Sequence, residues 1–246
     1  MVGRLFILAA FATLLAAAPA VAKKVPVDLE LAFVVDLSGS IDDAEVRLQR
    51  EGYSDALAHP RVLNAISGGF LRSIAVAYIE FAAEDCETLS VPWTLIGGRP
   101  AAAEFGRRVV ERPRWFCAGG NAIGDAIAFA TKSIEDNVFE GTRLVIDVSG
   151  DGTNTLGRSV TRARDAAVAR NMTVNGLVID RPDIPELYEY FKEFVIGGPG
   201  AFAIRADDRK TFAAAILKKL LAEIAARPPA GAAPQQARRT GAIGRR

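Results

Sequence analysis

The stretch Leu29–Asp36, which reads LELAFVVD, is followed directly by Leu37-Ser38-Gly39-Ser40. A short, mostly apolar run that ends in an acid is typical of a strand buried on both faces. Asp42 and Asp43 then predict the start of a helix that continues to about Leu57, because acidic side chains are favoured at helix N-termini. The opening segment therefore indicates the strand and helix of a βαβ unit.

The rest of the chain repeats this alternation of strands and helices. The second and third predicted strands are separated by about six residues, too few for a parallel crossover, so we expect them to pair antiparallel. We predict an α/β fold: a doubly wound, mainly parallel central sheet with one antiparallel edge strand and helices on both faces. Further strands are predicted at 73–81, 88–96, 142–148, 173–179 and 202–204, and further helices at 100–111, 122–135, 160–170, 184–191 and 210–225.

The two ends of the chain differ from this domain in composition. Residues 1–22 combine Arg4, an apolar run and a small-residue cleavage pattern at 20–22, as in a secretory signal peptide. The alternative is an uncleaved membrane anchor. Residues 227–246 are rich in Pro, Ala, Gly and Arg and predict a disordered basic tail. We therefore predict one domain at 23–226, exported to the periplasm or outside the cell, with no membrane span once the signal peptide is removed.

Charge and cysteine content narrow the class of protein. Residues 23–226 contain five more acidic than basic residues, which argues against nucleic-acid binding by bulk charge. The chain has two cysteines, Cys86 and Cys117. In an oxidising compartment such a pair suggests one disulfide, and two buried free thiols are the alternative.

Oxygen-bearing side chains follow two of the predicted parallel strands. Residues 36–40 end the first strand, and Ser149-Gly150-Asp151-Gly152 follow the strand at 142–148. Ligands in doubly wound sheets bind beyond the carboxyl ends of the strands, and Gly119-Gly120-Asn121 begins a helix at the same rim. Carboxylate, hydroxyl and amide oxygens suit Mg²⁺, Mn²⁺ or Ca²⁺ better than zinc or copper. The only histidine, His59, is expected near the end of the first helix without a catalytic role.

With these motifs the sequence resembles a von Willebrand factor A-type (VWA) domain, the fold shared with integrin inserted domains. It is particularly similar to secreted bacterial members of unestablished function. The resemblance covers 25–226. In that family a metal-ion-dependent adhesion site (MIDAS) uses an Asp-x-Ser-x-Ser motif, a Thr from a second loop and an Asp from a third. The resemblance implies that Asp36, Ser38, Ser40 and Asp151 are metal ligands.

Asn121 stands where the family has its second-loop Thr, and this is a departure from the pattern. Its amide oxygen can face a cation or a coordinated water, or it can cap the following helix. Trp115 and Asp180, the latter together with its neighbour Arg181, are candidates for contacts at the rim, with core packing and a surface turn as their respective alternatives. Asp147, inside a strand, is interpreted as a hydrogen-bonded structural acid, with support of the metal ligands as the alternative.

We expect the domain to bind a protein partner through the cation, with the partner offering an acidic side chain, and we do not expect an enzyme. An accessory or structural domain with a vestigial metal site is one alternative, supported by Asn121. A haloacid-dehalogenase-like phosphatase is another, because residues 150–154 resemble the metal-binding run of those enzymes. They require an acidic residue as general acid at the position of Ser38, and serine cannot act as that acid.

Overall fold

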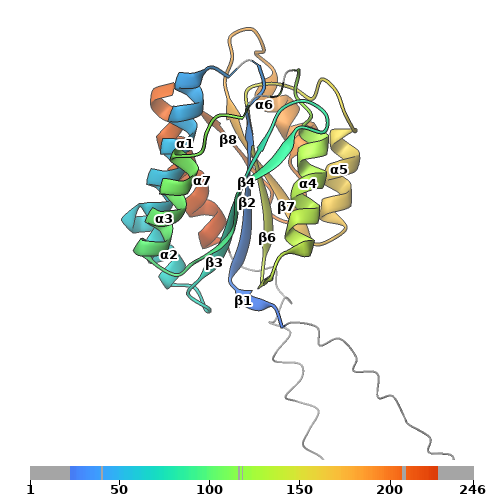
Figure 1. The fold of residues 1–246 in the computed structure, drawn as a ribbon. Coiled ribbons are helices and arrows are strands. Elements are labelled where there is room, and N and C mark those ends of the chain that lie inside the picture. Colours follow the sequence, from blue (N-terminus) through green and yellow to red (C-terminus); the bar gives the residue numbers. More distant parts are fainter. Residues whose placement is uncertain (1–22, 40, 116, 118, 207–208, 227–246) are drawn as a thin grey trace, which may run out of the picture.

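The computed structural model describes residues 23–226 apart from 40, 116, 118 and 207–208 (Figure 1). The predicted signal peptide and basic tail lie outside the described residues. Within the part of the chain that is described, no helix has the length and apolar character needed to cross a membrane.

A six-stranded sheet in the order β4-β3-β2-β6-β7-β8 forms the centre of the molecule. All neighbouring strands are parallel except β3 and β4, which pair antiparallel at one edge. This arrangement confirms the predicted fold class and the predicted hairpin. The strands are β2 (Leu29–Asp36), β3 (Ile74–Phe81), β4 (Glu87–Ile96), β6 (Leu144–Gly150), β7 (Met172–Ile179) and β8 (Ala203–Ala206).

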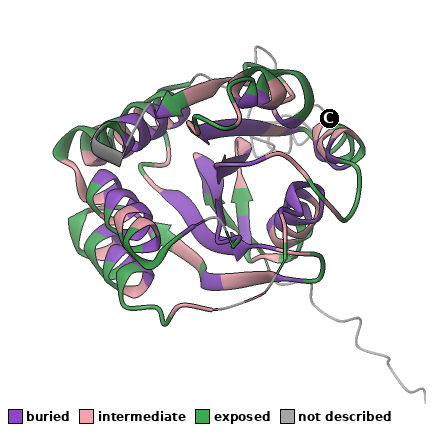
Figure 2. Cartoon of the chain, turned by 90° about the horizontal axis from the view of Figure 1, so that it is seen from above, coloured by how far each residue is buried: buried purple, intermediate pink, exposed green. Residues whose placement is uncertain are grey.

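Helices cover both faces of this sheet, so that the sheet is buried between two outer layers (Figures 1 and 2). The helices of the first face are α1 (Asp43–Ala58), α2 (Pro60–Ser67), α3 (Arg99–Val110) and α7 (Arg209–Ala225). The second face carries α4 (Ile123–Asp136), α5 (Val160–Val168) and α6 (Leu187–Tyr190), which continues into a π-helical turn, Phe191–Val195.

One helix and two strands, α2, β1 and β5, were not predicted from the sequence. His59 lies between α1 and α2, ending the first helix and capping the second. Its Nδ1 accepts a hydrogen bond from the Arg61 N–H at 3.2 Å. Pro60 is compatible with the first turn of this new helix, because its missing N–H is not needed there. Strands β1 (Val25–Val27) and β5 (Phe139–Gly141) form a separate parallel pair. At three residues each, they are too short for a clear alternating pattern.

The helix predicted at 184–191 is wrong in its bounds. Pro182 and Pro185 restrict the start of this segment to turns, and α6 begins only at Leu187. The chain then continues as a π-helical turn to Val195, which buries Phe191 and Val195 against the second face of the sheet.

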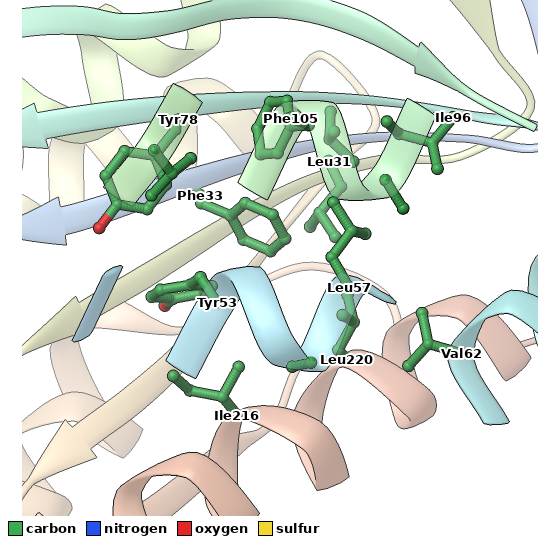
Figure 3. Close-up of a cluster of buried hydrophobic side chains, with 14 of the residues drawn as sticks. Leu31, Phe33, Tyr53, Leu57, Val62, Tyr78, Ile96, Phe105, Ile216 and Leu220 are labelled. Atoms are coloured by element: carbon green, nitrogen blue, oxygen red, sulfur yellow. The ribbon is translucent and has the colours of Figure 1, made fainter. Parts of the chain in front are cut away.

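Aromatic side chains hold α1 against the first face of the sheet (Figure 3). The Tyr53 ring lies 4.7 Å from the Phe33 ring and 5.6 Å from the Tyr78 ring, measured between centroids. Ile216 and Leu220 of α7 complete the same cluster. Because α1 begins just after the loop that follows β2, this packing fixes the position of that loop.

A buried ion cluster ties α7 to the sheet. The Lys219 ammonium, on a side chain only 1% exposed, pairs with Asp147 of β6 and with Glu223. Asn175 of β7 donates from Nδ2 to Glu223 Oε1 at 2.9 Å. Burial and the negative charge of Glu223 raise the pKa of Asp147 well above its ordinary value, and Lys219 opposes this rise. Asp147 is thus a structural acid, as the sequence favoured.

Replacing Lys219 by methionine should lower the free energy of unfolding by about 3–5 kcal/mol at pH 7, because two buried carboxylates lose their cation. The loss should shrink as the pH falls, since protonation removes their charge. Urea unfolding at pH 5 and pH 7 measures both effects. Lys218→Met, on the exposed side of the same helix, is the matched control and should change stability by at most about 0.5 kcal/mol. Equal effects of the two substitutions would contradict the role of the cluster.

Candidate metal centre

The first part of the site is the turn that follows β2. Asp36, the last residue of β2, is completely buried, and its Oδ1 accepts a hydrogen bond from the Ser38 N–H at 2.7 Å. Asp36 Oδ2 has no hydrogen-bond partner in the described part of the chain. Leu37 and Ile41 are buried with Val46 of α1 and hold the turn in place. One carboxylate oxygen therefore shapes the turn, while the other remains available.

Asp151 is brought beside Asp36 by the pairing of β2 with β6. These strands are parallel neighbours, with Val35 opposite Ser149, so the residues that follow lie at the same rim. A Cβ atom on Gly150 would come within 3.1 Å of Asp36 Oδ2, which shows how closely the two strand ends approach. The Asp151 side chain is 7% exposed, and its Oδ2 lies 3.2 Å from Nη1 of Arg181.

Burial, together with the nearby charge of Asp151, makes ionisation of Asp36 unfavourable. Burial raises the pKa of Asp36 to about 7, and the charge of Asp151 contributes to the rise. Hydrogen bonds from Ser38 and the backbone N–H of Asp151 act in the opposite direction. A positive charge at this position would favour the ionised form of Asp36.

Asn121 lies in a third loop that is joined to the loop of Asp151. The Asn121 N–H donates to Thr155 Oγ1 at 2.8 Å, and the Thr155 N–H donates to the Asn121 carbonyl at 2.8 Å. A Cβ atom on Gly152 would lie only 2.3 Å from Asn121 Nδ2, so the amide packs directly against the residue after Asp151. Asn121 is 6% exposed, and its Oδ1 has no hydrogen-bond partner among the described residues.

Asn121 does not cap α4, and the helix-cap alternative is wrong. The N-cap residue of α4 is Ala122, which makes no side-chain capping bond. The Gly124 N–H instead donates to Asn154 Oδ1 at 3.0 Å, so a residue of the Asp151 loop serves this end of α4. The Asn121 side chain therefore does not stabilise the start of α4.

A disulfide supports the loop that carries Asn121. Cys86 and Cys117 are bonded, with Cα atoms 6.2 Å apart, which confirms the predicted pair. The bond joins the β3–β4 turn to the segment before Asn121. The Ala122 N–H also donates to the Ala82 carbonyl at the end of β3, at 2.8 Å. The loop is thus attached both to β3 and to the loop after β6.

The remaining predicted residues fall at different places. Ser38 is buried beside Asp36, and Ser40 lies outside the described residues. Trp115 is half-buried in the segment before Cys117. Its neighbour Arg114 donates to the Ile41 carbonyl at 2.6 Å, which links this segment to the Asp36 turn.

Asp180 and the residue after it face different partners at the rim. Asp180 pairs with Arg205 at 3.3 Å, whereas the next residue, Arg181, reaches Asp151. The sequence placed both residues after β7 at the correct rim but did not show which side chain points inward. A basic residue at a rim that contains two acids was the available signal for Arg181.

The centre is built from two carboxylates and several neutral oxygens. Among the residues that the structure describes, no group of three or more His, Cys, Asp or Glu side chains is placed to hold a metal. Two carboxylates with hydroxyl and amide oxygens match the preference of hard cations, which retain waters when the protein supplies few ligands.

The family follows from a sequence-model comparison. The model of the family described as "Protein of unknown function (DUF1194)" matches residues 26–228. The chain belongs to this family. Among curated proteins, none matches the chain.

Solved structures show which fold this DUF1194 member has. It is similar to the pilus adhesin SpaC from Lactobacillus rhamnosus GG, with a TM-score of 0.60 and 14% identity over 82% of this chain and 31% of SpaC. It is also similar to a von Willebrand factor type A protein from Catenulispora acidiphila, with a TM-score of 0.56 and 16% identity over 80% of this chain and 43% of that one.

A third similar structure is proximal thread matrix protein 1 of the mussel byssus, described with a zinc-occupied MIDAS motif. Its TM-score is 0.56, with 13% identity over 83% of this chain and 50% of that protein. The chain thus spans half or less of each of these proteins. At these identities the likeness establishes the fold, which confirms the VWA resemblance seen in the sequence.

Asp36→Asn should stabilise the cation-free protein at pH 8 by about 2–4 kcal/mol, because it removes a buried negative charge. The folded-state pKa of Asp36 lies above the ordinary value of 3.8, so the folded state holds this proton more tightly. Stability contributed by the protonated group is present at low pH and is lost as the pH rises toward about 7. The gain should therefore be smaller at pH 5.

Urea unfolding in EDTA at pH 5 and pH 8 measures this difference. Asp43→Asn, at a side chain that is 82% exposed, is the matched control and should show no comparable gain at pH 8. Destabilisation by Asp36→Asn at both pH values would contradict the electrostatic cost assigned to Asp36.

Proposed function

We propose that this domain binds a divalent cation at the rim and uses it to hold an acidic side chain of a protein partner. Mg²⁺ is the proposed cation, with Mn²⁺ or Ca²⁺ as alternatives. The observation that carries the proposal is a pair of buried acceptor atoms without donors, Asp36 Oδ2 and Asn121 Oδ1, in the described part of the rim. Leaving such acceptors unpaired is costly, and a cation would satisfy both.

The proposed ligand set contains Asp36, Ser38, Asn121 and Asp151, and Ser40 completes it by sequence. Asp36 and Asp151 supply charge, whereas Ser38 and Asn121 supply neutral oxygens, directly or through water. The zinc-occupied MIDAS motif of the mussel protein supports the idea that a divalent ion can occupy this kind of site on the VWA fold. The oxygen-only set favours a harder ion in this chain.

Binding fits these side chains better than catalysis does. His59, a common type of general base, ends α1 and caps α2 through Nδ1. The phosphatase alternative needs a general acid at Ser38, where a hydroxyl stands. A bound cation would supply positive charge and a coordination position for a carboxylate. The residues of this chain would hold that ion, and the buried Asp36 turn would keep its ligands in fixed positions.

An exported location is also part of the proposal. The Cys86–Cys117 disulfide is typical of proteins in oxidising compartments. The predicted signal peptide supports the same compartment, and SpaC is described as a pilus adhesin. A protein partner in the periplasm or outside the cell agrees with these observations.

Isothermal titration of the folded protein with Mg²⁺, Mn²⁺ and Ca²⁺ tests the cation directly. We expect saturable binding to the wild type and a loss of at least about tenfold in affinity for Asp36→Asn, which loses one of two charged ligands. Asp43→Asn should bind as the wild type does. Absence of binding by the wild type would favour the alternative of a structural domain with a vestigial site.

Capture from an envelope extract on immobilised protein tests the partner. We expect proteins retained by the wild type in Mg²⁺ to be released by EDTA and to be absent with Asp36→Asn. The urea unfolding described above shows whether the variant is folded, which excludes unfolding as the reason for the loss. Retention of the same proteins in excess EDTA would contradict a cation-mediated contact.

A further inference from the structure

Arg181 is an intrinsic positive charge at the candidate metal centre. Its Nη1 lies 3.2 Å from Asp151 Oδ2, and the side chain is 32% exposed. Arg181 follows β7, and β2 and β7 are the two neighbours of β6 in the sheet. Arg181 and the β2 turn therefore flank the end of β6 from opposite sides. A guanidinium and a divalent ion would both be stabilised by Asp151, the acid shared by the two contacts.

The other edge of the guanidinium is held by Asp183. Arg181 Nε lies 3.0 Å from Asp183 Oδ1, and Nη2 lies 2.8 Å from Asp183 Oδ2, a two-point contact of the kind that fixes arginine well. Asp183 is 62% exposed and belongs to the same loop as Arg181. Arg181 can therefore give up Asp151 and keep a carboxylate partner, so the release is not prohibitive.

We propose that Arg181 sets the cation affinity of the site by competing with the divalent ion for Asp151. In the cation-free domain, the guanidinium neutralises Asp151 and limits its repulsion with the buried Asp36. Binding of the ion removes the need for that charge and places two positive groups next to one carboxylate. This inference rests on the proposed function, because it concerns the affinity of that same site.

This competition predicts two opposite effects of replacing Arg181. Arg181→Gln should lower the free energy of unfolding of the cation-free protein, because Asp151 loses its guanidinium while remaining buried. The same substitution should strengthen cation binding, because the ion no longer competes with a fixed charge or is repelled by it. If Arg181 merely positioned Asp151, its substitution would instead lower both the stability and the affinity for the cation.

Arg205→Gln is a matched control for the loss of one positive charge. Arg205 is on β8, next to β7, and its guanidinium pairs with Asp180 at 3.3 Å and lies over the Tyr188 ring. Asp180 is the residue before Arg181, so the control removes a neighbouring charge of the same kind. The described contacts of Arg205 do not include Asp36 or Asp151.

The test is isothermal titration with Mg²⁺ on wild type, Arg181→Gln and Arg205→Gln, together with melting temperatures in EDTA and in saturating Mg²⁺. We expect about tenfold tighter Mg²⁺ binding by Arg181→Gln and a change of less than about threefold for Arg205→Gln. Arg181→Gln should melt below the wild type in EDTA and gain more from Mg²⁺.

Equal or weaker Mg²⁺ binding by Arg181→Gln, with clear binding by the wild type, would overturn the role of Arg181 and leave the proposed function intact. Similar gains for both variants would also overturn it, because they would indicate a general effect of net charge. If none of the three proteins binds Mg²⁺, the proposed function fails, and the inference fails with it.

Discussion

The parallel pairing of β2 with β6 is the constraint on which the candidate site depends. With Val35 opposite Ser149, the two strand ends place Asp36 and Asp151 at one rim of the sheet. The cores on both faces fix this register, because a shift by one residue would exchange the buried side chains of the two faces. The site is therefore as well defined as the sheet itself, although its ligands belong to turns.

Two groups of buried acids, one between β6 and α7 and one at the rim, are balanced by the protein in different ways. Asp147 and Glu223 share the ammonium of Lys219, a covalent part of α7 that cannot leave without unfolding the helix. Asp36 and Asp151 have Arg181 at the edge, with the Asp36 Oδ2 acceptor unpaired within the described chain. The first arrangement stabilises the fold, whereas the second is where we propose that an exchangeable ion binds.

The difference explains why the two clusters are assigned different roles. A fully enclosed cluster with an internal cation gains nothing from a ligand, and a substitution in it should appear as a loss of stability. A rim site with excess negative charge is costly without a ligand and favourable with one. Residues that bind ligands often reduce stability in this way, so the expected gain from Asp36→Asn has the same physical origin as cation binding.

The sequence predicted the features that follow from strand periodicity and from strand ends. Strand β2, the antiparallel edge strand and the common rim of residues 36 and 151 were all accessible, because parallel strands end on the same side. The Cys86–Cys117 bond also followed from the expected compartment. Strands β1 and β5 could not be predicted from the sequence, because three-residue strands are formed by tertiary contacts and are too short to show a pattern.

Side-chain direction at turns was the other limit. The sequence placed Asp180 and Arg181 at the rim, but a local turn decides which of them points toward Asp151. It also left open whether Asn121 caps α4, and this depended on Asn154, which lies 33 residues away in the chain and reaches the Gly124 N–H. Both questions concern contacts between loops, where neither helical nor strand periodicity applies.

Anomalous diffraction from crystals grown with Mn²⁺ tests the central claim most directly, because it locates the ion without assuming its ligands. The account predicts one strong peak within about 2.5 Å of carboxylate oxygens of Asp36 or Asp151, with Asn121 in the first or second coordination sphere. A well-ordered rim without such a peak at saturating Mn²⁺, or a peak held by other residues only, would contradict it.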